Sequence, residues 1–195
     1  IDLLWWDGYD WPVGIDHHPA ETERWVRSLQ PGIVINDRNM IWNQGRWGGD
    51  FNTAFENRDP DRRPSTAWEQ CEAICGCWAW CGEEQACKSA AHILERLARN
   101  RAWGGNYLAG FGPRGDGAMA PSYYRICDEL AGWMRHSGES VSDVQPGPWP
   151  ERSDAPVTVR GNTWYLHFLL PAQRTATLLG APEPRSATLL RTGAA

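Results

Sequence analysis

The sequence predicts an α/β fold built on a parallel sheet, and three segments near its beginning carry this prediction. Residues 2–6 and 33–36 are short apolar runs, which are typical of strands buried in a parallel sheet. Between them, a helix is predicted from Pro19, with acidic residues in its first turn and an end before Pro31. Strand, helix and strand at this spacing form a βαβ unit, in which the two strands run parallel.

Both predicted strands end in charged residues. The first apolar run ends at Asp7 and is followed by Gly8, and the second leads into Asp37 and Arg38. In an α/β barrel, functional side chains lie where the parallel strands end. We therefore expect Asp7 and Arg38 on one rim of such a barrel.

The same alternation of strands and helices continues as far as residue 143. The apolar pattern predicts, in order, a strand or short helix over 68–74, a helix over 83–100, a strand over 106–111 and a helix over 121–136. Residues 39–66 have no periodicity and are rich in Gly, Asn, Asp, Arg and Pro. They predict a long loop, and loops of this length are usually functional.

The pattern changes after a proline-rich stretch over residues 145–150. Alternating residues over 156–160 and 163–170 flank Gly161-Asn162, which predicts a β-hairpin, and two more strands are predicted over 176–179 and 187–190. A complete (β/α)8 barrel takes about 250 residues, and about four βα units are visible here. We therefore predict the C-terminal half of a TIM-type barrel over residues 1–143, followed by an all-β, sandwich-type domain over 144–195 that need not be complete.

Charge and hydropathy argue against nucleic-acid binding and against a membrane span or a signal peptide. The net charge is −5 with no basic stripe, which argues against nucleic acid. No apolar run is long enough for a membrane span or a signal peptide. The first residues read as the middle of a strand, so we expect a fragment of a longer protein.

Tryptophan is unusually frequent, with 13 residues. Some gather near the predicted site, around Asp7 and in the glycine-rich loop that follows: Trp5, Trp6, Trp11, Trp42 and Trp47. Flat apolar rings suit the C–H faces of sugars, although large aromatic residues also serve as core. Core packing is the expectation for four others: Trp25, Trp103, Trp133 and Trp164.

Five of the six cysteines fall within residues 71–87, and the sixth is Cys127. Their spacings match no common zinc pattern. Buried free thiols are the prediction, with a disulfide or a metal site as open alternatives. A G-x-G-x-x-G match over 110–115 does not open a helix, so a dinucleotide site is not predicted. His17-His18 is expected to be a surface pair.

Two carboxylates and an arginine point to chemistry on sugars. Glu56 lies in the long loop, and Asp7 and Arg38 lie at strand ends. Two carboxyl groups about 5–5.5 Å apart are what a retaining glycosidase needs. Glu69 is a third acid that could take part. The alternative is that Asp7 and Glu56 are ordinary loop acids, one capping a turn and the other in a surface ion pair.

Several motifs in order together resemble glycoside hydrolase family 29, the α-L-fucosidases. The matching segments are Leu4-Trp5-Trp6-Asp7-Gly8, residues 29–38, residues 49–56, Trp68-Glu69-Gln70-Cys71, residues 104–108, residues 112–117 and Gly132-Trp133-Met134. The resemblance implies a retaining mechanism with Asp7 as nucleophile and Glu56 as acid/base. It places Arg38 in the N-D-R motif and Trp5 in the wall of the sugar pocket, and we expect Trp6 to contact substrate as well.

The resemblance also implies a partner and a location. It implies a fucosylated glycan or oligosaccharide as substrate, no metal or other cofactor, an extracellular or periplasmic location, and it is compatible with a homo-oligomer. Phe55 adds one residue before Glu56, and Ala79 and cysteines replace the usual residues near position 79. The family's fucose-gripping histidines belong to the first half of the barrel.

The prediction is therefore an α-L-fucosidase-like hydrolase whose 195 residues are inactive when isolated. One alternative is a carbohydrate-binding protein, derived from a glycosidase, that has lost catalysis. Another is a thiol or metal protein built on the cysteine cluster.

Overall fold

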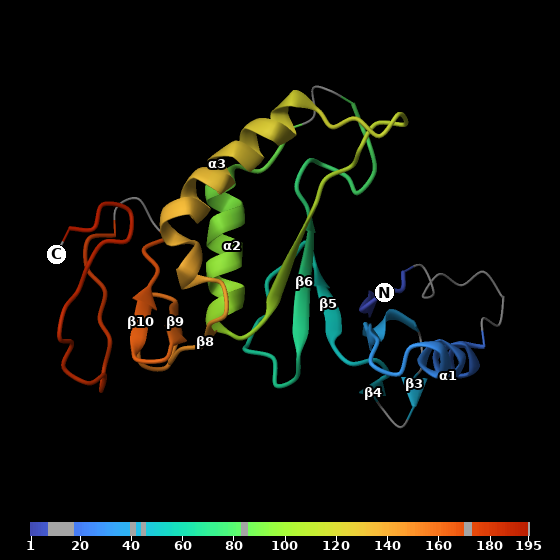
Figure 1. The fold of residues 1–195 in the computed structure, drawn as a ribbon, viewed down its shortest axis with the longest axis horizontal. Coiled ribbons are helices and arrows are strands. Elements are labelled where there is room, and N and C mark those ends of the chain that lie inside the picture. The colour runs from blue at the N-terminus through green and yellow to red at the C-terminus, as the bar shows by residue number, and fades with distance from the viewer. Residues whose placement is uncertain (8–17, 40–41, 44–45, 83–85, 170–172, 195) are drawn as a thin grey trace. The chain divides into compact units, whose positions relative to one another are not determined.

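The computed structural model describes residues 1–7, 18–39, 42–43, 46–82, 86–169 and 173–194 (Figure 1). The chain divides into two compact units, Ile1–Gln70 and Cys71–Ala195, and each is described by itself. The elements are β1 (Leu3–Leu4), α1 (Pro19–Leu29), β2 (Val34–Ile35), η1 (Asp37–Asn39), β3 (Trp42–Asn43), β4 (Arg46–Trp47), β5 (Asn52–Glu56), β6 (Trp68–Ala73), α2 (Ala90–Ala102), β7 (Asn106–Gly110), α3 (Pro121–Ser137), η2 (Gly138–Ser140), β8 (Gln145–Pro146), β9 (Val157–Arg160) and β10 (Thr163–Leu166).

The first unit begins with the predicted βαβ arrangement. Strands β1 and β2 are parallel, with Leu3 opposite Val34 and Leu4 opposite Ile35. Ile35 is fully buried, as expected for an apolar strand residue. The next residue, Asn36, forms a separate, isolated parallel bridge with Phe51. The parallel pair is therefore confirmed.

Helix α1 begins at Pro19 and ends before Pro31, as predicted, but its apolar residues are not buried. Trp25 is 61% exposed, so the expectation that it packs in the core is wrong, and Leu29 is 67% exposed. The helix is held instead by Arg27, which donates hydrogen bonds to Asp50 and to the backbone carbonyl of Ile33, both at 3.0 Å. A polar side chain thus joins α1 to the residue before β2 and to the segment between β4 and β5.

The stretch predicted as a structureless loop contains three strands. Strands β3 and β4 form an antiparallel pair, and β5 neighbours β6. Thr53 in β5 is fully buried although its strand is polar. The sequence pattern missed β5 because its buried residue Thr53 binds polar groups, and Phe55, which packs on Trp68, is a single aromatic residue without an apolar period.

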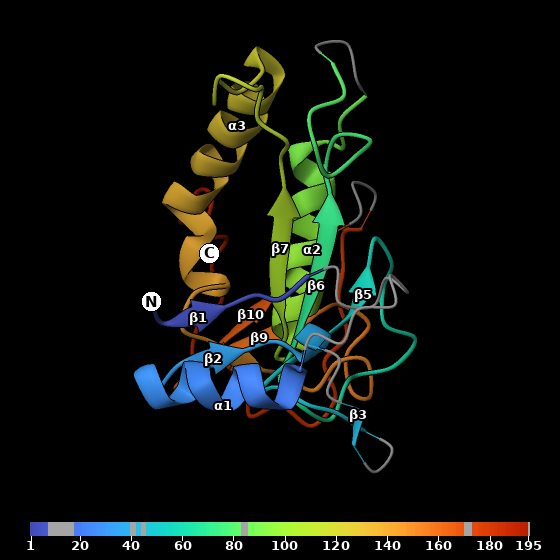
Figure 2. The same cartoon turned by 90° about the vertical axis from the view of Figure 1, so that its right-hand side faces the viewer.

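Strand β6 begins in the first unit and ends in the second; it neighbours β7, and α2 runs along β7 (Figure 2). Every residue of β6 is buried, and this strand and β7 lie where the sequence predicts strands. Ile74, directly after β6, is fully buried and packs with four other residues to form the core: Cys75, Ile93, Ala120 and Tyr123. This core holds the ends of both strands against α2 and α3.

Helix α2 begins at Ala90, later than the predicted start at residue 83; residues 83–85 lie outside the described residues. Ser89 caps the helix, because its side chain accepts a hydrogen bond from the backbone N–H of His92 at 3.2 Å. Cys87 and Lys88 are used otherwise, in a disulfide and in a bond to Glu72. Helix α3 lies where predicted.

A buried carboxylate joins β6, α2 and β7. The Glu72 side chain is 4% exposed and lies 2.6 Å from Lys88 Nζ, 3.0 Å from His92 Nε2 and 2.5 Å from Tyr107 Oη. Burial opposes ionisation of Glu72, but hydrogen bonds from Lys88, Tyr107 and His92 outweigh it and keep the pKa of this carboxyl below its ordinary value. A polar network thus replaces apolar contacts at this point.

The last part of the chain contains the predicted hairpin. Strands β9 and β10 are antiparallel, with Val159 opposite Trp164, and Gly161 in the turn has φ 57°. Strand β8 pairs with the other edge of β9. The strands predicted over 176–179 and 187–190 are absent from the described residues, where Leu178 forms a single bridge to Ser153. These segments are mostly exposed, and their described backbone bonds are confined to Thr177 and Leu179, which pair with Asp154 and Arg152, and to the turn at Leu189.

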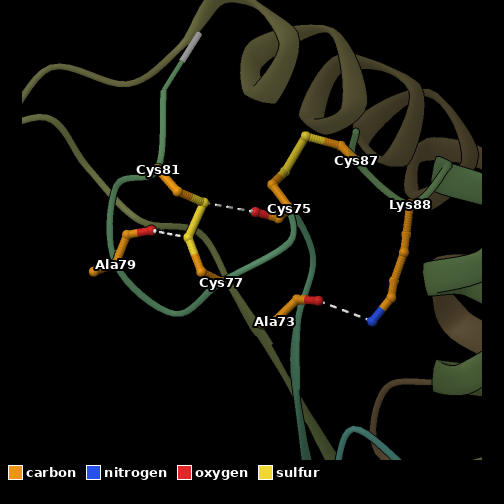
Figure 3. Close-up of a disulfide and its surroundings, with 7 residues drawn as sticks. All are labelled: Ala73, Cys75, Cys77, Ala79, Cys81, Cys87 and Lys88. Atoms are coloured by element: carbon orange, nitrogen blue, oxygen red, sulfur yellow. Dashed lines mark hydrogen bonds between the residues drawn. A yellow bond between two sulfur atoms is a disulfide. The ribbon is translucent and has the colours of Figure 1, made fainter. Parts of the chain in front are cut away.

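The prediction of buried free thiols is wrong for four of the six cysteines, which form disulfides, and its burial is wrong for Cys127, which is exposed. Cys75 is bonded to Cys87 and Cys77 to Cys81 (Figure 3). Cys71 and Cys127 belong to neither disulfide. Spacing alone could not reveal the pairing, because the fold brings Cys75 and Cys87 together. Among the described residues, no three His, Cys, Asp or Glu side chains gather as a metal site would require. None of the described helices has the length and apolarity that crossing a membrane requires.

Thiol titration checks the disulfides. The denatured, unreduced chain should react at two thiols, Cys71 and Cys127, because disulfide sulfurs are not nucleophilic. After reduction, all six cysteines should react. Six reactive thiols before reduction would contradict both disulfides.

The buried side chain of His167 should make the free energy of unfolding depend on pH in the acid range. Thr158 Oγ1 donates to the Ser140 carbonyl, so His167 Nε2 donates to Thr158 Oγ1 at 3.0 Å. Burial lowers the pKa of His167 from 6.5 to about 4. Between pH 6.5 and 4, His167 is protonated in the unfolded chain but stays neutral in the folded chain. Folding stability should therefore fall by about 1.4 kcal/mol per pH unit down to pH 4 on account of this residue.

The variant His167→Gln isolates this contribution. In denaturant titrations at a series of pH values, the variant should lose stability less steeply than the wild type between pH 6.5 and 4. Equal slopes would show that His167 does not set this dependence.

Candidate active site

A polar segment directly after β2 forms the centre of the site. Asn36, Asp37 and Arg38 follow the apolar strand, and the short helix η1 begins at Asp37. Asn36 is fully buried and Asp37 is 8% exposed, so their polar groups need hydrogen-bond partners. Each of the three side chains binds a different part of the first unit.

Arg38 binds the two predicted catalytic carboxylates. Its Nη1 lies 3.1 Å from Asp7 Oδ1, and its Nη2 lies 2.8 Å from Glu56 Oε2. The Arg38 side chain is 21% exposed, whereas Asp7 is 70% exposed and Glu56 is 40% exposed. A single, largely buried guanidinium therefore holds two carboxylates that solvent and ligands can reach.

Thr53 and Asp37 fix the arginine from the opposite side. Arg38 Nε donates to Thr53 Oγ1 at 3.0 Å, and Nη2 donates to the Thr53 carbonyl at 3.1 Å. Asp37 Oδ1 in turn accepts from the backbone N–H of Thr53 at 2.9 Å and from its hydroxyl at 2.8 Å. Because β5 carries both Thr53 and Glu56, these bonds also fix the strand that presents Glu56.

Trp5 supports the guanidinium through its ring. Arg38 Cζ lies 4.6 Å from the centroid of the Trp5 ring, which is a cation–π arrangement. The indole Nε1 of Trp5 donates to Glu69 Oε1 at 2.9 Å. Trp5 and Asp7 both contact the Arg38 guanidinium, Trp5 through its ring and Asp7 through its carboxylate.

Asn36 fixes the backbone just before Asp7. Its Oδ1 accepts from the Trp6 N–H at 2.7 Å, and its Nδ2 donates to the Trp6 carbonyl at 2.9 Å. That carbonyl belongs to the peptide bond that leads into Asp7. The chain returns close to Asn36 at Gly49, which has φ 86° and where a Cβ would lie 2.4 Å from the Asn36 carbonyl oxygen. Only glycine fits there.

Of the predicted site residues, the structure brings together Trp5, Asp7, Arg38 and Glu56. Trp6 is half-buried, and its described contacts to Asn36 are through its backbone. Trp11 lies outside the described residues, and so do the side chains of Trp42 and Trp47. The sequence analysis missed three positioning groups, Asn36, Asp37 and Thr53. The signal for the first two is a polar pair directly after a buried strand.

The charges of the site suit an uncharged polar ligand better than a cation. The guanidinium lies between the carboxylates, so a metal ion there would meet a fixed positive charge. Two accessible carboxylates, an arginine and an aromatic ring can together attack, protonate and orient a sugar.

Comparisons with known sequences agree with the motifs. The sequence profile described as alpha-L-fucosidase matches residues 1–139. Tissue alpha-L-fucosidase of Rattus norvegicus is 28% identical over 203 residues, which cover 96% of this chain and 42% of the relative. A putative alpha-L-fucosidase of Caenorhabditis elegans is 28% identical over 173 residues, covering 84% of this chain and 34% of the relative. The chain thus spans about two fifths of the length of such relatives or less.

Solved structures share the fold. Alpha-L-fucosidase isoenzyme 1 from Paenibacillus thiaminolyticus has a TM-score of 0.84 at 24% identity, covering 100% of this chain and 49% of that one. A family 29 alpha-L-fucosidase from Bacteroides thetaiotaomicron has a TM-score of 0.70 at 24% identity, covering 81% and 40%. Another structure of a Bacteroides thetaiotaomicron enzyme holds a trapped covalent intermediate with 2-fluoro-fucosyl fluoride.

Removal of the Asn36 side chain tests how the backbone before Asp7 is held. Asn36→Ala leaves the part-buried N–H and C=O of Trp6 without these partners, which should lower the free energy of unfolding by about 1–3 kcal/mol. Amide hydrogen exchange at Trp6 should accelerate in the folded state. Asn162→Ala, in the exposed hairpin turn, is the control and should change neither quantity. An unchanged exchange rate at Trp6 would contradict the assignment.

Proposed function

Since this chain belongs to the α-L-fucosidase family, we propose that it supplies the nucleophile and the acid/base of a retaining glycoside hydrolase that removes terminal α-linked L-fucose. The observation that carries the proposal is the pair of ion pairs from Arg38 to Asp7 and to Glu56. A retaining enzyme needs two carboxyl groups on one sugar, and a shared arginine keeps two such groups close.

Asp7 attacks the anomeric carbon in the first step. As the bond from that carbon to the glycosidic oxygen breaks, the oxygen takes a proton from Glu56 and leaves. In the second step, water gives a proton to Glu56 and attacks the same carbon, which releases the Asp7 carboxylate. Two inversions return the sugar to its original configuration.

Glu56 must exchange its ion pair with Arg38 for a proton before the first step. Its 40% exposure supports this, because an incoming glycosidic oxygen can reach the carboxyl group from solvent. Arg38 then remains on Asp7, whose anionic form is the nucleophile. Trp5 offers its ring to the apolar face of the sugar, and Trp6 is the second proposed substrate contact.

The proposal extends to the architecture. Residues 1–143 correspond to the later half of a (β/α)8 barrel, and residues 144–195 to a β-sandwich domain. A half barrel leaves a strand edge unpaired and lacks part of the sugar site. We expect these 195 residues alone to hydrolyse fucosides slowly or not at all. Two disulfides support an oxidising compartment, outside the cell or in the periplasm.

Azide rescue tests both roles in a protein that carries these residues together with the rest of the barrel. Asp7→Gly should abolish hydrolysis of 4-nitrophenyl α-L-fucoside, and azide should restore turnover as the inverted β-fucosyl azide. Glu56→Ala should lower turnover by about 10²–10⁴-fold, and azide should then yield the retained α-fucosyl azide. Product configuration is read by NMR.

Glu21→Ala, an exposed acid on α1, is the matched control and should retain full activity. Undiminished turnover by Asp7→Gly, or the same azide anomer from both variants, would overturn the role assignment. Fucoside binding without turnover by the unsubstituted protein would favour a carbohydrate-binding protein instead.

A further inference from the structure

Glu69 is a carboxylate near the site that the proposed mechanism does not use. It is the second residue of β6 and is only 6% exposed, and its Oε1 accepts the indole N–H of Trp5 at 2.9 Å. Glu69 is thus far less accessible than Asp7 or Glu56, so a sugar cannot readily contact it. Its bond to the Trp5 indole links it to the residues of the site.

Burying an ionised carboxylate costs free energy unless strong hydrogen-bond donors replace the water that it loses. A bond from an N–H to an ionised acceptor is stronger than one between neutral groups. The indole has one donor, Nε1, so this bond fixes where the edge of the ring points. Once that edge is fixed, the ring can turn only with loss of the bond.

The face of the Trp5 ring, as distinct from its edge, contacts Arg38. Arg38 Cζ is 4.6 Å from the Trp5 ring centroid, and the same guanidinium reaches Asp7 and Glu56. A tilt of the Trp5 ring would therefore remove the surface on which Arg38 rests. The chain of contacts runs from Glu69 through Trp5 to Arg38, and all three residues belong to the first unit.

We propose that Glu69 is a positioning residue that sets the plane of the Trp5 ring and, through it, the place of Arg38. The consequence for the reaction rests on the proposed function, because it matters only if Arg38 serves two catalytic carboxylates. The placement of the ring does not depend on that function and can be measured separately.

The first measurement needs no activity and uses the 195-residue chain. Glu69→Gln keeps an oxygen acceptor, whereas Glu69→Met removes it at similar size. The indole N–H signal of Trp5 is assigned by its loss in Trp5→Phe. In Glu69→Met it should shift and exchange with solvent faster, whereas in Glu69→Gln it should stay near the wild-type position.

Gln70→Met is the matched control. Gln70 is the next residue of β6, is fully buried, and binds the Arg58 carbonyl at 2.7 Å instead of Trp5. Its replacement should lower stability without moving the Trp5 indole signal. An indole signal that is the same in Glu69→Met and the wild type, or that moves equally in Gln70→Met, would overturn the proposal.

The second measurement is a double-mutant cycle in a protein with the complete barrel. Glu69→Met should lower kcat/KM for the aryl fucoside by about 10²-fold, since small displacements of positioning groups cost this much. Glu69→Gln should recover most of the loss. In the Trp5→Phe background, which itself lowers kcat/KM, Glu69→Met should cost little more, because its effect passes through the indole N–H.

The outcomes separate the two claims. An undiminished loss in the Trp5→Phe background would overturn the positioning role and leave the fucosidase proposal standing. If the unsubstituted protein with the complete barrel does not hydrolyse the fucoside, the fucosidase proposal is overturned. The indole signal of the 195-residue chain still decides whether Glu69 positions Trp5. If Glu69→Met does not fold, Glu69→Gln and Trp5→Phe remain: the proposal then requires a near-normal indole signal in the former and reduced kcat/KM in the latter.

Discussion

The guanidinium of Arg38 is the group on which the arrangement of the site depends. Asp7 follows β1 and Glu56 ends β5, so no local segment brings them together. Two carboxylates at close range repel each other, and a shared cation offsets this repulsion. Because Arg38 is 21% exposed and fixed by Thr53 and Trp5, it acts as a preorganised charge rather than as a mobile surface residue.

Three consecutive residues each hold a different part of the site in place. Asn36 holds the peptide before Asp7, Asp37 holds Thr53, and Arg38 holds the two carboxylates. They share one short segment, which begins where β2 ends, and their side chains bind residues next to β1 and in β5. The supports are buried and the groups proposed to react are exposed, an arrangement that combines rigidity with access.

Regular apolar patterns made part of this structure predictable. The βαβ unit, β7, α3 and the hairpin at Gly161 follow from apolar runs, proline positions and turn residues. The ordered motifs predicted the family, and the polar ends of two strands predicted Asp7 and Arg38 as site residues. Glu56 required the resemblance, because its strand has no apolar period.

The remainder depends on contacts that sequence patterns do not encode. Strand β5 is stabilised by Asp37 and Arg38, and α1 is held by Arg27 while Trp25 stays exposed. The disulfide between Cys75 and Cys87 depends on how the chain turns after β6. Glu69 could be seen in the sequence as a third acid, but only the fold reveals that it binds Trp5.

NMR of the Arg38 side chain tests the central claim most directly. A guanidinium held by Asp7, Glu56 and Thr53 should rotate slowly, so its Nη hydrogens should give separate, slowly exchanging signals in the wild type. These signals should merge in Asp7→Asn and in Glu56→Gln, each of which weakens one ion pair. A single averaged signal for Arg38 in the wild type would mean that the guanidinium rotates freely and does not join the two carboxylates.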